Sequence, residues 1–81
     1  MNKAEIETKV KAMLAYKLML DISLVTNESD LINDLGADDI DMVEICMETE
    51  KEFNIATPDE EWYEEINTVQ ELINLVARKI V

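Results

Sequence analysis

The chain has 81 residues, a length that fits one small domain spanning 1–81. It carries 19 acidic and 7 basic residues and a net charge of −12, which argues against nucleic acid or an anionic membrane as a partner and favours basic protein surfaces. It has no histidine and one cysteine, which excludes His-dependent catalytic triads, an internal disulfide and the usual tetrahedral zinc site. With one glycine and one proline, a β-sandwich or barrel is not expected.

The apolar residues form no long run. The longest stretch, 12–16, has five residues, so we expect no membrane span. The first five residues lack the apolar segment of a signal peptide, and the lone cysteine is compatible with a reducing compartment, so we expect a cytoplasmic protein. We also expect a monomer without enzymatic activity, because a small helical chain offers no cleft for catalysis, and no specific metal site.

The negative charge is concentrated in one segment. Residues 28–65 contain fifteen acids and one base, whereas the other 43 residues contain four acids and six bases. The acids could simply keep a small protein soluble. They could also form a docking surface, which depends on where they fall on the helices.

A first helix is predicted from Lys3 to about Leu18 or Leu20. Asn2 and Glu5 resemble a capping box at its start. Helical spacing predicts one buried face, consisting of Ile6, Val10, Met13 and Leu14.

A long connection, about 21–38, follows this helix. Loops of this length are usually functional or held by their own apolar residues, which here would be Ile22, Leu24, Val25, Leu31, Ile32 and Leu35. Gly36, the only glycine, allows a sharp turn into the next helix.

The second helix is predicted from about Asp39 to Phe53. Its expected buried face consists of Ile40, Val43, Cys46, Met47 and Phe53. An acidic stripe lies opposite, with Ile45 at its border and Met42 further round; its members are Asp41, Glu44, Glu48 and Glu52. Like charges four residues apart destabilise a helix, so the stripe is either a solvated face or, as we favour, a docking surface.

Two further helices complete the chain. Thr57 and Pro58 favour a short helix over about 59–65, whose Trp62 and Tyr63 either pack at its edge or contact a partner. Thr68 and Glu71 form a capping box for the last helix, with a buried stripe of Val69, Leu72, Ile73, Val76 and Ile80. The expected fold is all-α: a four-helix bundle with a long first loop and a short third helix.

The entrance to the second helix resembles a known motif. Residues 34–44 read D-L-G-A-D-D-I-D-M-V-E, which resembles the D-L-G-x-D-S-L-D-x-V-E signature of acyl carrier proteins. The resemblance continues at Met47, Glu50, Glu52 and Phe53, then at 58–61 and 66–70, and so covers essentially the whole chain.

This resemblance implies a carrier in fatty-acid-type or polyketide-type synthesis. In such proteins the central serine holds phosphopantetheine, whose thiol carries the acyl chain. The second helix docks on basic patches of the synthesis enzymes and of phosphopantetheinyl transferase. The implied partner-binding residues are Asp38, Asp41, Met42, Glu44, Ile45, Glu48, Glu50 and Glu52. Candidates for the acyl pocket or core are Val43, Met47, Phe53, Ile66, Leu72 and Val76.

The chain departs from the motif at Asp39, where the family has its serine. A carboxylate offers no hydroxyl for a phosphodiester, so no phosphopantetheine is expected on this chain as written. Ser23 and Ser29 lie outside any matching motif, and Cys46 is expected to be a small core residue. Asp39 could mark a blocked carrier or a natural serine-less homologue. The alternative function is a non-carrier interaction module that keeps the fold and the docking helix.

Overall fold

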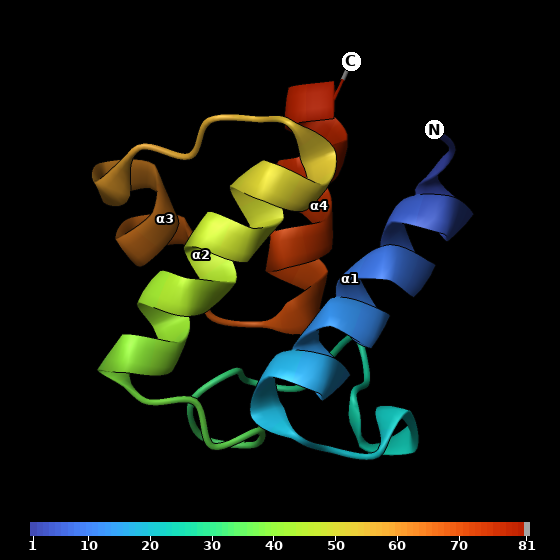
Figure 1. Ribbon diagram of the computed structural model, residues 1–81, viewed down its shortest axis with the longest axis vertical. Helices are drawn as coiled ribbons and strands as arrows, with labels where there is room; N and C mark the ends of the chain where they lie inside the picture. Colours follow the sequence, from blue (N-terminus) through green and yellow to red (C-terminus); the bar gives the residue numbers. More distant parts are fainter. Residues whose placement is uncertain (81) are drawn as a thin grey trace.

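The computed structural model describes residues 1–80, apart from the side chain of Asp59. Its elements are α1 (Lys3–Leu18), the 3-10 turn η1 (Ile22–Leu24), α2 (Asp39–Phe53), α3 (Asp59–Glu65) and α4 (Val69–Ile80). In Figure 1, α1 runs opposite to α2 and α4, and α3 lies beside α2. Helix α1 packs against both α2 and α4. The predicted all-helical bundle with a short third helix is therefore confirmed.

The helix starts follow the capping residues of the sequence. At α1, Glu5 N donates to Asn2 Oδ1 at 2.9 Å, and at α4, Glu71 N donates to Thr68 Oγ1 at 3.2 Å. In return Glu71 Oε1 accepts from Thr68 N at 2.8 Å. These bonds satisfy N–H groups that have no partner within the helix. Both predicted capping boxes are confirmed.

The core is shared among α1, α2 and α4, each of which contributes several buried side chains. The predicted faces are confirmed at Ile6, Val10 and Leu14 of α1, and at Val69, Leu72, Ile73 and Val76 of α4, all of which are buried. Met13 and Ile80, predicted in the same faces, are only partly buried and pack against the edge of this core.

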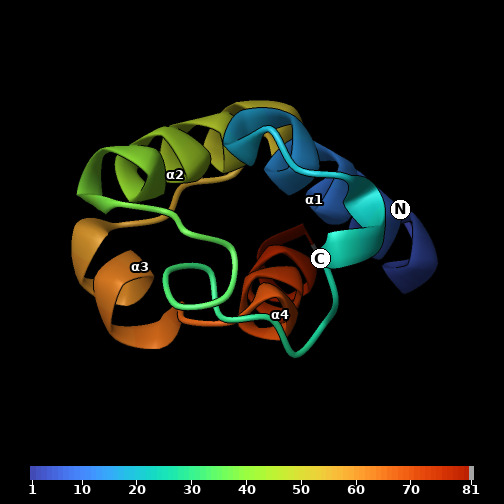
Figure 2. The same ribbon diagram turned by 90° about the horizontal axis from the view of Figure 1, so that it is seen from below.

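The long connection between α1 and α2 passes across one end of the bundle (Figure 2). Val25, Leu31 and Leu35 are buried as predicted. The prediction was wrong for three others, because 51%, 58% and 50% of Ile22, Leu24 and Ile32 remain exposed. Gly36 has φ +77°, which confirms that the glycine makes the turn into α2.

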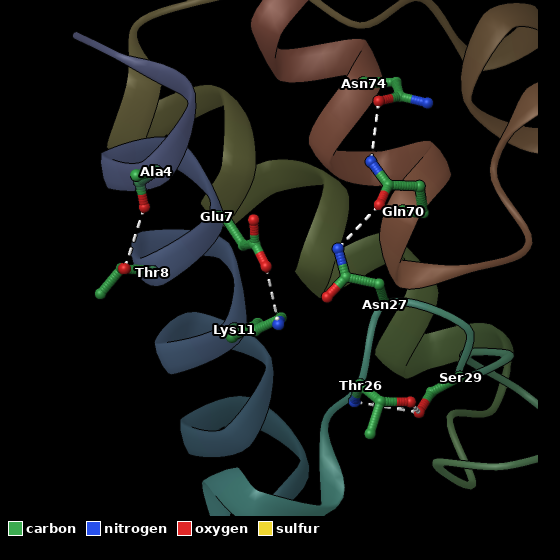
Figure 3. Close-up of polar contacts among 9 residues, drawn as sticks. All are labelled: Ala4, Glu7, Thr8, Lys11, Thr26, Asn27, Ser29, Gln70 and Asn74. Carbon is green, nitrogen blue, oxygen red and sulfur yellow. Dashed lines mark hydrogen bonds and ion pairs between the residues drawn. The ribbon is translucent and has the colours of Figure 1, made fainter.

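Hydrogen bonds, in place of the predicted apolar contacts that do not form, fix the long connection to the bundle. Figure 3 shows Asn27 reaching α4, where its Nδ2 donates to Gln70 Oε1 at 2.7 Å. Gln70 in turn donates to Asn74 Oδ1 at 2.9 Å. The backbone adds Leu31 N to Asn67 O at 2.8 Å and Val69 N to Ser29 O at 3.0 Å. The connection is thus fixed to the start of α4.

Within residues 1–80, no helix combines the length and the apolar character that crossing a membrane requires.

Candidate functional site

The start of α2 is fixed by two of the predicted docking acids. Asp41 N donates to Asp38 Oδ1 at 2.8 Å, and Asp38 N donates to Asp41 Oδ2 at 3.1 Å. This capping box uses the carboxylates that the sequence suggested for partners, so both have a structural role. Asp39 is the first residue of α2 and is exposed. A group attached at this position would therefore extend into solvent.

The buried face of α2 differs from the predicted one. Ile40, Val43 and Met47 were expected inside, but 70%, 43% and 63% of these side chains are exposed. Burial falls instead on Met42, Ile45, Cys46, Thr49 and Phe53. The prediction was wrong for Ile40, Val43 and Met47 and is confirmed for Cys46 and Phe53.

The error has a physical reason. Apolar residues occur on two sides of α2, and helical periodicity alone does not say which side meets the core. The true core side has a polar residue in its middle, Thr49, which is fully buried. Its Oγ1 donates to Ile45 O at 2.7 Å, so the hydroxyl is satisfied within the helix.

Because the core side of α2 differs from the predicted one, two of the residues predicted to bind partners are inaccessible. Met42 and Ile45 are 4% and 0% exposed, so neither offers a surface to a partner. The large apolar side chains that α2 exposes are instead Ile40, Val43 and Met47. Their exposure is the signal that sequence reasoning missed. A large contiguous patch of exposed apolar side chains is typical of interaction surfaces, whereas single exposed apolar residues are common on any protein.

The acidic stripe is partly compensated by α1. Lys17 Nζ lies 3.8 Å from Glu48 Oε2, and Lys9 Nζ lies 3.8 Å from Glu52 Oε1. These cations come from a different helix, which sequence spacing within α2 could not reveal. Glu44, between Ile40 and Met47 on the helix surface, is exposed. The outward surface of α2 therefore combines Ile40, Val43, Glu44 and Met47, which we call the α2 surface.

Glu50 of α2 forms a hydrogen bond with the segment that follows the helix. Its Oε2 accepts from Thr57 N at 2.8 Å, and Thr57 Oγ1 lies 3.0 Å from Cys46 Sγ. Glu50, predicted to bind partners, thus holds the segment that follows α2.

The remaining core candidates are buried as predicted: Phe53, Ile66, Leu72 and Val76. Of the aromatic pair, Trp62 is fully buried and Tyr63 is 55% exposed. Packing therefore accounts for Trp62.

Comparisons with known proteins agree with this geometry. The model of the phosphopantetheine attachment site family matches residues 8–76. Acyl carrier proteins of Thermotoga maritima and Thermosynechococcus vestitus are 39% and 41% identical to this chain. These matches cover 98% and 99% of this chain, and 96% and 98% of the respective relatives. That of Porphyromonas gingivalis is 42% identical over 95% of this chain and 97% of its own length.

A solved structure supports the same assignment. The apo doublet acyl carrier protein from prodigiosin biosynthesis superposes with a TM-score of 0.80 at 25% identity. The match covers 94% of this chain and 36% of the doublet chain, so this chain spans about a third of that protein. Because the family model matches residues 8–76 and the Thermotoga and Thermosynechococcus relatives are 39% and 41% identical over nearly the whole chain, the chain belongs to the acyl carrier protein family.

Proposed function

We propose that this protein docks on basic patches of acyl-synthesis enzymes through the α2 surface and, as written, carries no phosphopantetheine of its own. The observation that carries the docking proposal is the exposure of Ile40, Val43 and Met47 beside Glu44. An apolar centre with a charged rim suits a partner contact in which the charges guide encounter and orientation. Synthesis of the fatty-acid or polyketide type is the proposed setting.

The residues at the attachment position do not fit phosphopantetheine. The family attaches this group through a serine hydroxyl, and residue 39 offers a carboxylate instead. Ser29, elsewhere in the chain, is 7% exposed and its Oγ lies 2.9 Å from Thr26 Oγ1, so it is no substitute. We therefore propose that partner enzymes bind this chain while it carries no phosphopantetheine.

Asp39 also favours a second candidate function. A natural aspartate here would suit an interaction module that keeps the carrier fold and regulates or scaffolds acyl-handling enzymes. Aspartate is compatible with the first turn of a helix, where negative charge interacts favourably with the helix dipole. Reading residue 39 in the unmodified genomic sequence distinguishes a blocked carrier, which would have serine, from this module.

Incubation with coenzyme A and a broad-specificity phosphopantetheinyl transferase tests whether the chain can accept phosphopantetheine. Intact-mass measurement should give the bare polypeptide mass, and Asp39→Ser should restore modification because Asp38, Asp41 and the α2 surface are kept. An adduct mapped to any residue of the unchanged chain would disprove this part of the proposal.

Binding to the same transferase tests docking. Glu44→Lys should slow association strongly, since charges at the rim act mainly on the on-rate. Glu28→Lys is the matched control, because Glu28 is exposed on the long connection and the charge change is the same. Met47→Ser should raise the dissociation rate, with the exposed Tyr16→Ser as its control. Equal effects from test and control variants would show that α2 has no special part in binding.

A further inference from the structure

Helix α3 is tied to the end of α4 by a compact set of ion pairs. Arg78 Nη2 lies 3.2 Å from Glu61 Oε1 and 3.1 Å from Glu65 Oε2. Lys79 Nζ lies 3.0 Å from Glu61 Oε2. Glu61 and Glu65 are four residues apart, so they share one face of α3 and both meet the last turn of α4. We call these four residues the α3–α4 latch.

Helix α3 has few means of its own to stay formed. It has seven residues, well below the roughly 12–15 that an isolated helix needs to be stable in water. Five of the seven are acidic and none is basic, so its own charges repel one another. Its N-cap, Pro58, provides no side-chain hydrogen bond to the first turn. Attachment to the rest of the molecule must therefore supply its stability.

The second attachment is Trp62, and it is imperfect. The side chain is fully buried, yet within the described part of the chain its Nε1–H has no hydrogen-bond partner. Burying an unsatisfied donor offsets part of the gain from burying the ring. The balance between a docked and an undocked α3 is therefore sensitive to the ion pairs.

We propose that the α3–α4 latch is a charge-controlled device: Arg78 and Lys79 hold α3 against the bundle, and loss of these pairs lets α3 undock and expose Trp62. Cations that compete for Glu61 and Glu65, including a basic partner surface, would open it. This proposal does not depend on docking through the α2 surface.

The flanking contacts confine the motion to α3. On one side, Glu50 Oε2 holds Thr57 N at 2.8 Å. On the other, Asn67 O accepts from Leu31 N at 2.8 Å. Neither contact involves the latch, so both remain when it opens. The segment that moves thus lies between Thr57 and Asn67.

Trp62 is the only tryptophan, so its fluorescence reports the docking of α3 directly. In the double variant Arg78→Glu/Lys79→Glu, acrylamide quenching of Trp62 should increase. Amide exchange at Trp62 and Ile66 should accelerate about fivefold or more, since each exposed ion pair shifts such equilibria by up to this factor. Exchange at Leu75 and Val76 in α4 should stay slow.

Two further variants make the result decisive. The fourfold swap Glu61→Lys/Glu65→Lys/Arg78→Glu/Lys79→Glu should restore slow exchange. The milder pair Arg78→Gln/Lys79→Gln removes both cations of the latch without placing new negative charge beside Glu61 and Glu65, so it tests the proposal even if the first variant unfolds. The matched control is Lys9→Glu/Lys17→Glu, which makes the same charge change and breaks the pairs between α1 and α2.

Faster exchange confined to α3, absent in the control and reversed by the swap, would support the latch. Equal acceleration in the control, or unchanged α3 exchange in the Arg78→Gln/Lys79→Gln variant, would overturn it.

Discussion

Helices α2 and α3 are both strongly acidic, but the structure uses their acids differently. Helix α2 has fifteen residues, a capping box at its start and five buried side chains. Helix α3 has seven residues and no side-chain cap, and of its side chains described, at 60–65, only Trp62 is buried. Packing and capping thus hold α2, whereas α3 depends on one ring and on cations from α4.

The difference explains which acids remain available to partners. Because α2 is secured by its core side, Glu44 can stay exposed without a structural task. In α3, Glu61 and Glu65 are engaged by Arg78. Acidic composition therefore does not by itself predict a docking surface, because some acids cap a helix and others pair with basic residues of another helix.

The largest expected effect comes from removing the anchor of α3. Trp62→Ala should lower the free energy of unfolding by about 3 kcal/mol, at the lower end for buried aromatic residues, because it also removes the unpartnered N–H. Urea denaturation followed by circular dichroism measures the loss.

Two controls sharpen this comparison. Trp62→Phe keeps much of the apolar volume and should cost less than about 1.5 kcal/mol. Tyr63→Ala, on the exposed side of α3, should change stability by less than about 0.5 kcal/mol. A loss below about 1 kcal/mol for Trp62→Ala would mean that α3 contributes little to the fold and that the contrast with α2 is overstated.

A smaller effect is expected at the start of α2. Asp38→Ala removes the side-chain acceptor for Asp41 N and should cost about 1 kcal/mol, within the usual range for an N-cap. Asp38→Asn should be nearly neutral, since asparagine caps equally well. Thermal melts of the two variants distinguish a cap from a purely electrostatic role, for which both substitutions would act alike.

The features that the sequence predicted correctly are those that depend on residues close together in the chain. The capping pairs Asn2–Glu5 and Thr68–Glu71 are local, so their spacing was enough to place the starts of α1 and α4. The turn at Gly36 was equally predictable, because it depends on the φ angle of Gly36 itself.

The errors concern contacts between distant residues. The core side of α2 depends on how α1 and α4 approach it, and the burial of Thr49 in place of Met47 has no local signature. Glu50 was assigned to partners by its match to the family's acids, and its bond to Thr57 could not be predicted from that match because it forms only when the chain turns back after α2. The 3-10 turn at Ile22–Leu24 was not predicted, because the connection shows no helical period there. The resemblance of residues 34–44 to the family motif predicts that Asp39 occupies the attachment position, and this prediction depends on none of these contacts.

The smallest expected effect concerns pH and the acids of α3. The hydrogen bond from Lys79 lowers the pKa of the Glu61 carboxyl below its ordinary value of 4.5, and Arg78 adds to this. A carboxyl whose pKa is lower in the folded state stabilises the fold fully above its unfolded value, and this contribution is lost as the pH falls through the folded pKa. Glu61→Gln should therefore lower stability most near pH 7, and the difference from the unchanged protein should shrink as the pH falls below 4.5.

Denaturation curves at several pH values measure this difference, and a double-mutant cycle assigns it to the latch. In a chain already carrying Arg78→Gln and Lys79→Gln, the same Glu61→Gln change should no longer produce a difference that shrinks with falling pH, because the partners that lower the pKa are gone. If the pH trend persists without these cations, the stabilisation of Glu61 comes from α3 itself. In that case α3 would resemble α2 in supplying its own stability, and the contrast between the two helices would fail at its central point.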